Sequence, residues 1–130
     1  MDDATLLARF EDSTLPPAEL GHREHVRLAW LYLAGASFEV AALRFCQGLR
    51  GFAAAIGRAD RYHETITWAY LALVNERLQT PGSPPDFEGF ARANPDLFLP
   101  KGGALAAYYD EGLLHSERAR RAFILPRRAS

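Results

Sequence analysis

The hydrophobic positions of this chain recur with helical spacing. Leu6 and Phe10 lie on one side of a short helix predicted over residues 3–11, because residues three and four apart share a helix face. Pro16 and Pro17 follow, and neither can continue a helix interior. The first predicted helix therefore ends before these prolines.

Three longer helices are predicted in the middle of the chain, over residues 22–33, 38–56 and 61–79. Each carries an apolar stripe at intervals of three and four residues. Ser37 precedes the second of these helices and Asp60 the third. Their side chains are favourable N-caps, because an oxygen can accept a hydrogen bond from a free backbone N–H.

The last third of the chain predicts shorter elements. A proline-rich segment over residues 80–85 is the clearest linker, and Asp86 follows it as the cap of a helix ending near Ala93. Two more helices are expected, one over residues 103–111 and one from Ser116 to Phe123. No segment alternates like a strand.

These elements predict an all-α fold: a helical bundle of about five to seven helices. Residues 1–130 are expected to form one domain, because a chain of this length normally has a single core. The hydrophobic content of 48% and charged content of 24% are typical of a globular protein.

Charge and cysteine content narrow the functional classes. The net charge of −1 provides no strong field for nucleic acid or an anionic membrane, so neither is expected as a partner. The lone Cys46 cannot form an internal disulfide, which favours a reducing cytoplasm. The acidic N-terminus lacks the basic start of a signal peptide. A homodimer is an open alternative to a monomer.

Candidate chemistry gathers in two short motifs, Gly21-His22-Arg23-Glu24-His25 and Tyr62-His63-Glu64-Thr65-Ile66-Thr67. Each is expected to open a helix, with one helix between them. In an up-down-up bundle, the first and third helices are parallel and their N-termini share one end. The interpretation therefore brings together His22, His25, His63 and Glu64.

The leading hypothesis is a small enzyme of the hydrolase or lyase type, acting on a small molecule. In its metal-dependent form, His22, His25 and His63 bind a divalent transition metal, zinc or iron in the first instance, because imidazole is a common ligand for both. In its metal-free form, His63 is a general base. Glu64 is a further metal ligand in the first form and a proton shuttle in the second. Tyr62 and Thr67 orient the substrate in either form.

Two other classes stay open. A non-catalytic binding or sensing module would form its pocket from Tyr32, Trp68 and Tyr70, since aromatic rings often line small-molecule sites. An interaction protein would use the arginine-rich C-terminal helix that begins after Ser116. The histidines would then be a structural polar cluster.

The two histidine motifs, together with Asn94-Pro95-Asp96-Leu97 and Tyr108-Tyr109, resemble a family of small, uncharacterised bacterial helical proteins. The resemblance spans about residues 15–126, and its most specific part is the Tyr62-His63-Glu64-Thr65 element. In that family, threonine often stands where this chain has Gly21. The resemblance implies a bacterial, cytoplasmic, helical protein, and it implies no particular reaction.

Overall fold

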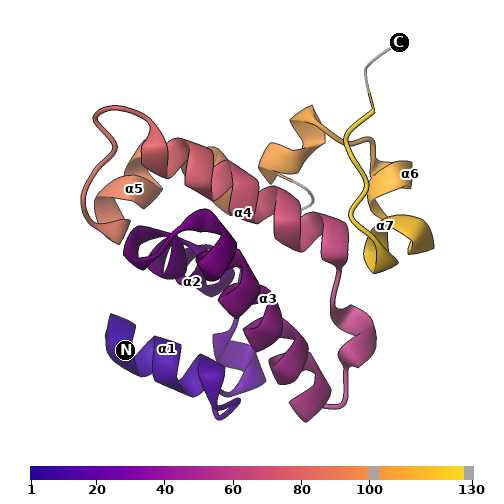
Figure 1. Ribbon diagram of the computed structural model, residues 1–130, viewed down its shortest axis with the longest axis horizontal. Helices are drawn as coiled ribbons and strands as arrows, with labels where there is room; N and C mark the ends of the chain where they lie inside the picture. The colour runs from indigo at the N-terminus through magenta and orange to yellow at the C-terminus, as the bar shows by residue number, and fades with distance from the viewer. Residues whose placement is uncertain (100–102, 128–130) are drawn as a thin grey trace.

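Helices make up the architecture of this protein. The computed structural model describes residues 1–99 and 103–127, and within these ranges it contains seven α-helices and no strand (Figure 1). The α-helices are α1 (Asp3–Glu11), α2 (His22–Gly35), α3 (Phe38–Ala55), α4 (Glu64–Gln79), α5 (Phe87–Ala93), α6 (Glu111–Leu114) and α7 (Glu117–Arg121). Four 3-10 helices join them: η1 (Pro17–Glu19), η2 (Ala59–Arg61), η3 (Pro95–Phe98) and η4 (Gly103–Ala107). The predicted all-α class is confirmed.

Local capping signals place most helix starts correctly. The side chains of Ser37, Asp86 and Ser116 each accept a hydrogen bond from the backbone N–H three residues later, at the starts of α3, α5 and α7. At the start of α2, the Gly21 N–H donates to the Glu24 carboxylate at 3.1 Å. Glycine has no side chain to return this bond, so α2 has only half of a capping box.

The predicted start of the fourth helix is wrong by three residues. Asp60 does not cap it, because Asp60 lies inside η2 and its carboxylate faces Arg58 at 3.4 Å. His63 is the N-cap instead. Its backbone is extended, and its Nδ1 accepts the Ile66 N–H at 3.1 Å. An imidazole nitrogen thus takes the place expected for a carboxylate oxygen.

The C-terminal predictions also need correction. The helix expected over residues 103–111 is the 3-10 helix η4, followed by the separate α6, whose cap is Asp110. The last helix ends at Arg121 rather than Phe123. The backbone becomes extended after Arg121, because the Thr65 hydroxyl bonds to it. This hydroxyl donates to the Ala122 carbonyl at 2.8 Å and accepts the Ile124 N–H at 3.1 Å.

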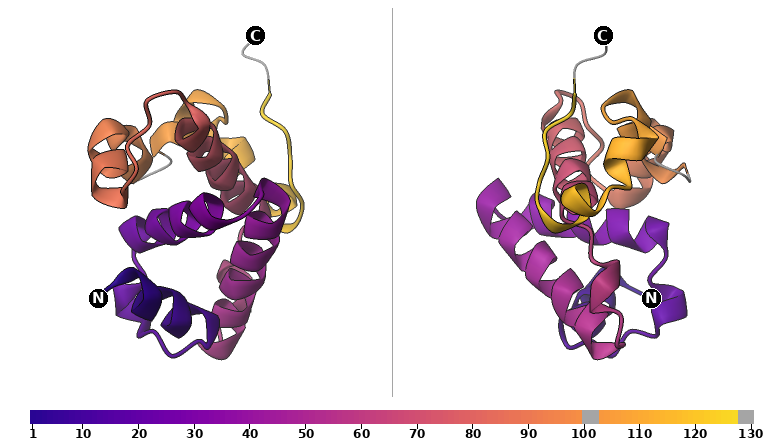
Figure 2. Two further views of the ribbon diagram at one scale, coloured as in Figure 1. Left: turned by 60° about the vertical axis from the view of Figure 1, so that its left-hand side comes forward. Right: turned by 90° about the vertical axis from the view of Figure 1, so that its right-hand side faces the viewer.

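The core forms where α4 lies across α2 and α3, while α1 packs beside the α2–α3 pair (Figures 1 and 2). Its largest fully buried side chains come from several elements and include Phe10, Leu28, Leu71, Phe90 and Leu97. Burial of such side chains supplies the main driving force for folding, about 1.5–3 kcal/mol each. Within residues 1–99 and 103–127, no helix combines the length and apolar character needed to cross a membrane.

Arg77 of α4 fastens the α5–η3 segment to the core. Its guanidinium donates to both carboxylate oxygens of Asp96, at 3.0 and 2.8 Å, and to Oδ1 of Asn94 at 2.9 Å. Arg77 holds the pKa of Asp96 below its usual value, chiefly through these hydrogen bonds. This network fixes η3, and with it the Leu97 carbonyl, against α2 and α4.

Candidate functional site

A mainly apolar cavity lies between α2, α3 and α4. Its volume is about 280 Å³. The lining side chains are His22, His25, Val26 and Ala29 of α2, Phe45 and Leu49 of α3, and Ile66, Thr67, Tyr70 and Val74 of α4. A small apolar space with a few polar groups is typical of a ligand pocket.

A second cavity, of about 370 Å³, adjoins the first. The two share four lining residues: His25, Leu49, Ile66 and Thr67. The second cavity extends toward η1 and η2, where its walls include Leu20, Phe52, Ile56, Arg58, Arg61 and Tyr62. We call the two cavities together the α2–α4 groove, and its two parts the inner and outer cavities.

His25 lies where the two cavities meet. Its Nδ1 is 2.8 Å from the Gly21 carbonyl oxygen. Because a carbonyl can only accept, Nδ1 must carry the proton, and neutral His25 therefore has its lone pair on Nε2. Burial lowers the pKa of His25 and favours this neutral form. Among the described residues, no group forms a hydrogen bond with Nε2.

His22 has the opposite tautomer. Its Nε2 donates to the Leu97 carbonyl at 2.7 Å. The ring also meets the Tyr70 ring edge-on, with centroids 5.2 Å apart. His22 thus links α2 to η3 and forms part of the inner cavity wall.

His63 has a hydrogen bond at each ring nitrogen. Nδ1 accepts the Ile66 N–H, and Nε2 donates to the Leu114 carbonyl at 2.7 Å. Burial lowers the pKa of His63, so the imidazole is held neutral in this arrangement. To act as a base or a metal ligand, His63 would have to give up one of these bonds.

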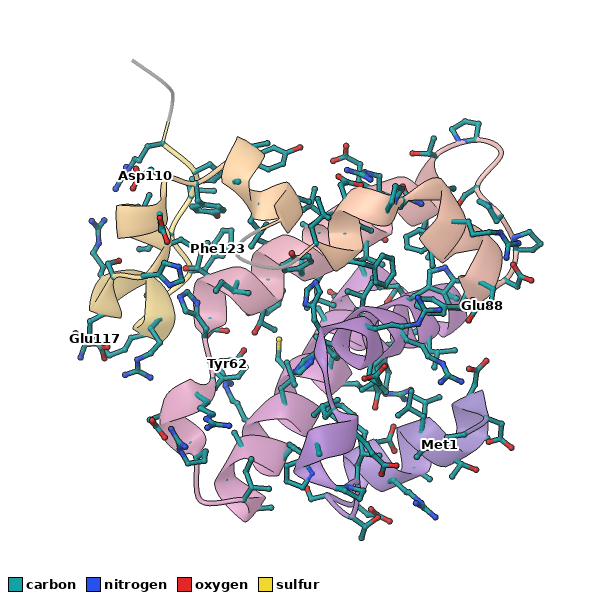
Figure 3. The ribbon with its side chains drawn as sticks, turned by 180° about the vertical axis from the view of Figure 1, so that it is seen from behind. Met1, Tyr62, Glu88, Asp110, Glu117 and Phe123 are labelled. Atoms are coloured by element: carbon teal, nitrogen blue, oxygen red, sulfur yellow. The ribbon has the colours of Figure 1, made fainter. Side chains whose placement is uncertain are left out.

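Glu64 faces a different set of partners from His63. Its Oε1 accepts the Tyr62 hydroxyl at 2.8 Å and the Trp68 indole N–H at 2.7 Å, while Oε2 pairs with Arg50 at 2.6 Å. Figure 3 shows Tyr62 at the junction of η2 and α4. Neighbouring side chains on a helix point about 100° apart. His63 and Glu64 accordingly form hydrogen bonds with different partners.

The predicted metal ligands are only partly brought together. His22 and His25 share the inner cavity, and His25 and His63 share the outer one. Within residues 1–99 and 103–127, however, no group of three or more His, Cys, Asp or Glu side chains is placed to hold a metal ion. His63 has both ring nitrogens in hydrogen bonds and does not fit the proposed ligand set in this arrangement. His22 and His25 each use only one ring nitrogen, on a backbone carbonyl, which is a common arrangement for a metal-bound histidine. The metal site stays a prediction.

The residues predicted to bind a substrate divide into two groups. Thr67 and Tyr70 line the inner cavity, and Tyr62 lines the outer one. Tyr32 and Trp68 lie elsewhere: the Tyr32 hydroxyl donates to Glu11 at 2.7 Å, and the Trp68 ring packs edge-on against Phe38. Desolvation raises the pKa of Tyr32, which keeps its hydroxyl protonated for this bond.

The sequence interpretation missed the α3 wall and the two arginines at the outer cavity. Leu49, Phe52 and Ile56 share the helical stripe expected of α3, but an apolar stripe does not reveal whether it faces a core or a cavity. Arg58 and Arg61 lie just before the Tyr62-His63 motif, and this proximity was a usable signal.

No known protein family, curated protein or solved structure matches this chain. The function is therefore inferred from the α2–α4 groove itself. The resemblance to small bacterial helical proteins, and the cytoplasmic location that it implies, stay predictions.

Proposed function

We propose that this protein binds a small, largely apolar molecule carrying one hydrogen-bond donor, in the α2–α4 groove. The observation that carries this proposal is the Nε2 lone pair of His25 at the meeting point of two apolar-walled cavities. Of the three functional classes open from the sequence, a binding or sensing module agrees best with this arrangement.

The groove offers complementary groups for such a ligand. Val26, Ile66 and Val74 supply apolar contact, and transfer of apolar surface from water favours binding. His25 accepts the ligand's donor. The Thr67 hydroxyl donates to the His63 carbonyl at 2.7 Å, so its oxygen also has a lone pair for the ligand.

An acid–base enzyme is the second candidate, with His25 rather than His63 as the base. A neutral imidazole with a lone pair beside bound substrate is suited to proton abstraction. His63 and Glu64 would then be positioning residues, because their polar atoms are occupied by the contacts with Leu114, Tyr62, Trp68 and Arg50.

Indole is a suitable first probe, because it is compact, apolar and has one N–H donor. We expect indole to shift the NMR signals of Ile66 and Val74 in the native protein. His25→Phe keeps an aromatic ring but removes the acceptor, and we expect about five- to tenfold weaker binding, the usual effect of one neutral hydrogen bond. His115→Phe, at an exposed histidine outside the groove, is the matched control.

The outcomes separate the candidates. Saturable shifts at the groove that weaken in His25→Phe but not in His115→Phe support the binding proposal. Shifts of signals outside the groove would contradict it. The absence of any shift with indole, and with other aromatic compounds of similar size that carry a donor, would contradict it as well. Conversion of a bound compound that ceases in His25→Phe would favour the enzyme over the binding module.

A further inference from the structure

Among the residues that the structure describes, charged side chains line the α2–α4 groove at one end only. Arg58 and Arg61 line the outer cavity, and no Asp or Glu side chain among residues 1–99 and 103–127 lines either cavity. The inner cavity has histidine, threonine and tyrosine as its polar lining residues, together with aliphatic and phenyl groups. A ligand that fills both cavities therefore meets an apolar, uncharged environment at one end and guanidinium groups at the other.

The two arginines differ in how their charge is balanced. Arg58 lies 3.4 Å from the Asp60 carboxylate, and both side chains are largely exposed. For Arg61, no carboxylate of the described residues lies within ion-pair distance. The outer cavity thus has about one positive charge in excess, which a single negative charge on a ligand would balance.

The apolar walls continue up to these arginines. Leu20, Phe52 and Ile56 line the outer cavity beside Arg58 and Arg61. Arg61 is exposed, so its attraction to an anion is that of a surface charge, which water and salt partly screen. A cationic ligand would meet Arg61, which has no carboxylate of the described residues within ion-pair distance.

We infer that the ligand is an amphipathic monocarboxylate: a compact apolar body with one N–H or O–H donor and a carboxylate on a short arm. The donor faces His25, and the carboxylate faces Arg61 at the outer cavity. This inference rests on the proposed function and names its ligand class. A planar carboxylate suits the guanidinium, which can donate two parallel hydrogen bonds to it.

Three probes that share one ring and one N–H donor test the inference: indole-3-acetate, indole and tryptamine, which are anionic, neutral and cationic at pH 7.5. Binding to the native protein is measured by NMR titration at low and moderate salt. We expect indole-3-acetate to bind about fivefold more tightly than indole, and tryptamine to bind most weakly. The preference for the anion should shrink as salt is added.

Arg61→Gln removes the charge while keeping a long polar side chain, and we expect it to abolish the preference for indole-3-acetate over indole. Arg92→Gln is the control, since Arg92 is an exposed arginine of α5 outside the groove. Thermal unfolding of both variants verifies that the fold persists.

The outcomes distinguish this inference from the proposed function. Equal binding of indole and indole-3-acetate, or a preference that survives Arg61→Gln, would overturn the monocarboxylate inference and leave the groove as a site for neutral molecules. Tighter binding of tryptamine would overturn it as well. Failure of all three probes to reach the groove would count against the proposed function itself.

Discussion

The imidazole of His63 connects the start of α4 to the Leu114 carbonyl, 51 residues further along the chain. Nε2 donates to that carbonyl at 2.7 Å, while Nδ1 caps α4 through the Ile66 N–H. One side chain therefore stabilises a helix start and attaches α6 to it. This relationship gives the Tyr62-His63-Glu64 motif a structural role that its composition alone did not reveal.

Replacing His63 tests this role. We expect His63→Ala to lower the free energy of unfolding by about 1–2 kcal/mol, because the cap and the bond to Leu114 are both lost. His63→Asn restores a capping oxygen and should recover part of the loss. Urea unfolding measures both variants beside His115→Ala, an exposed control. Equal stability of His63→Ala and the native protein would contradict the bridging role.

Stability should also depend on pH through the partly buried imidazoles of His25 and His63. Burial, with the nearby charges of His115 and Arg120, lowers the pKa of His63, and burial lowers that of His25. The unfolded chain, with histidine pKa values near ~6.5, then takes up protons first as the pH falls. The neutral imidazoles therefore make their full contribution to the free energy of unfolding above about pH 6.5. This contribution is lost as the pH falls through the lower pKa values of the folded state.

Urea unfolding between pH 8 and pH 5 measures this dependence. We expect the acid-side loss to be smaller in His63→Asn, which has no imidazole at this position. In His115→Ala the loss should fall only slightly, because burial is a larger cause of the lowered His63 pKa than the charge of His115. An identical pH profile for His63→Asn and the native protein would show that His63 is not held neutral by its surroundings.

Two glycines of α3 should respond oppositely to alanine. A Cβ on Gly48 would lie 2.4 Å from Cε2 of Phe10, a fully buried ring, whereas a Cβ on Gly51 would meet nothing within 4 Å. We expect Gly48→Ala to destabilise the protein by about 1–3 kcal/mol through overpacking. Gly51→Ala should stabilise it by up to about 1 kcal/mol through helix propensity. Thermal unfolding measures the stability of both variants. A Gly48→Ala variant more stable than the native protein would contradict the close approach of Phe10 to Gly48.

Thr65 should control the C-terminal segment. Its fully buried hydroxyl bonds to both Ala122 and Ile124. We expect Thr65→Val to cost about 1–3 kcal/mol, because it leaves a carbonyl and an N–H unpaired, and to speed hydrogen exchange at Ile124. Thr80→Val, where an exposed hydroxyl donates to the Glu76 carbonyl, should have little effect. Unchanged exchange at Ile124 would show that the segment is held by other contacts.

The histidine tautomers provide a direct check of the site. Long-range proton–nitrogen NMR at alkaline pH should show the Nδ1–H tautomer for His25 and the Nε2–H tautomer for His22 and His63. These assignments follow from the carbonyl partners Gly21, Leu97 and Leu114. An Nε2–H tautomer for His25 would remove the acceptor on which the proposed ligand contact depends.

The candidate site could be predicted only in part from the sequence. Thr67, expected to orient a substrate, and Tyr70, expected in the pocket of a binding module, both line the inner cavity. Trp68 lies on another face of α4, against Phe38. Tyr32 shares its helix with His25 but turns toward Glu11. A helical period separates faces of a single helix, but it does not say which neighbour each face meets.

The sequence alone determined the all-α class, most helix positions and the caps at Ser37, Asp86 and Ser116, because these depend on interactions within a few residues. Only the tertiary structure decided what the histidines contact. Their partners at Leu97 and Leu114 lie 75 and 51 residues away. Such bonds are set by how helices pack, and a backbone carbonyl acceptor is the same group at every residue. The carbonyl that each histidine contacts therefore cannot be identified from the sequence.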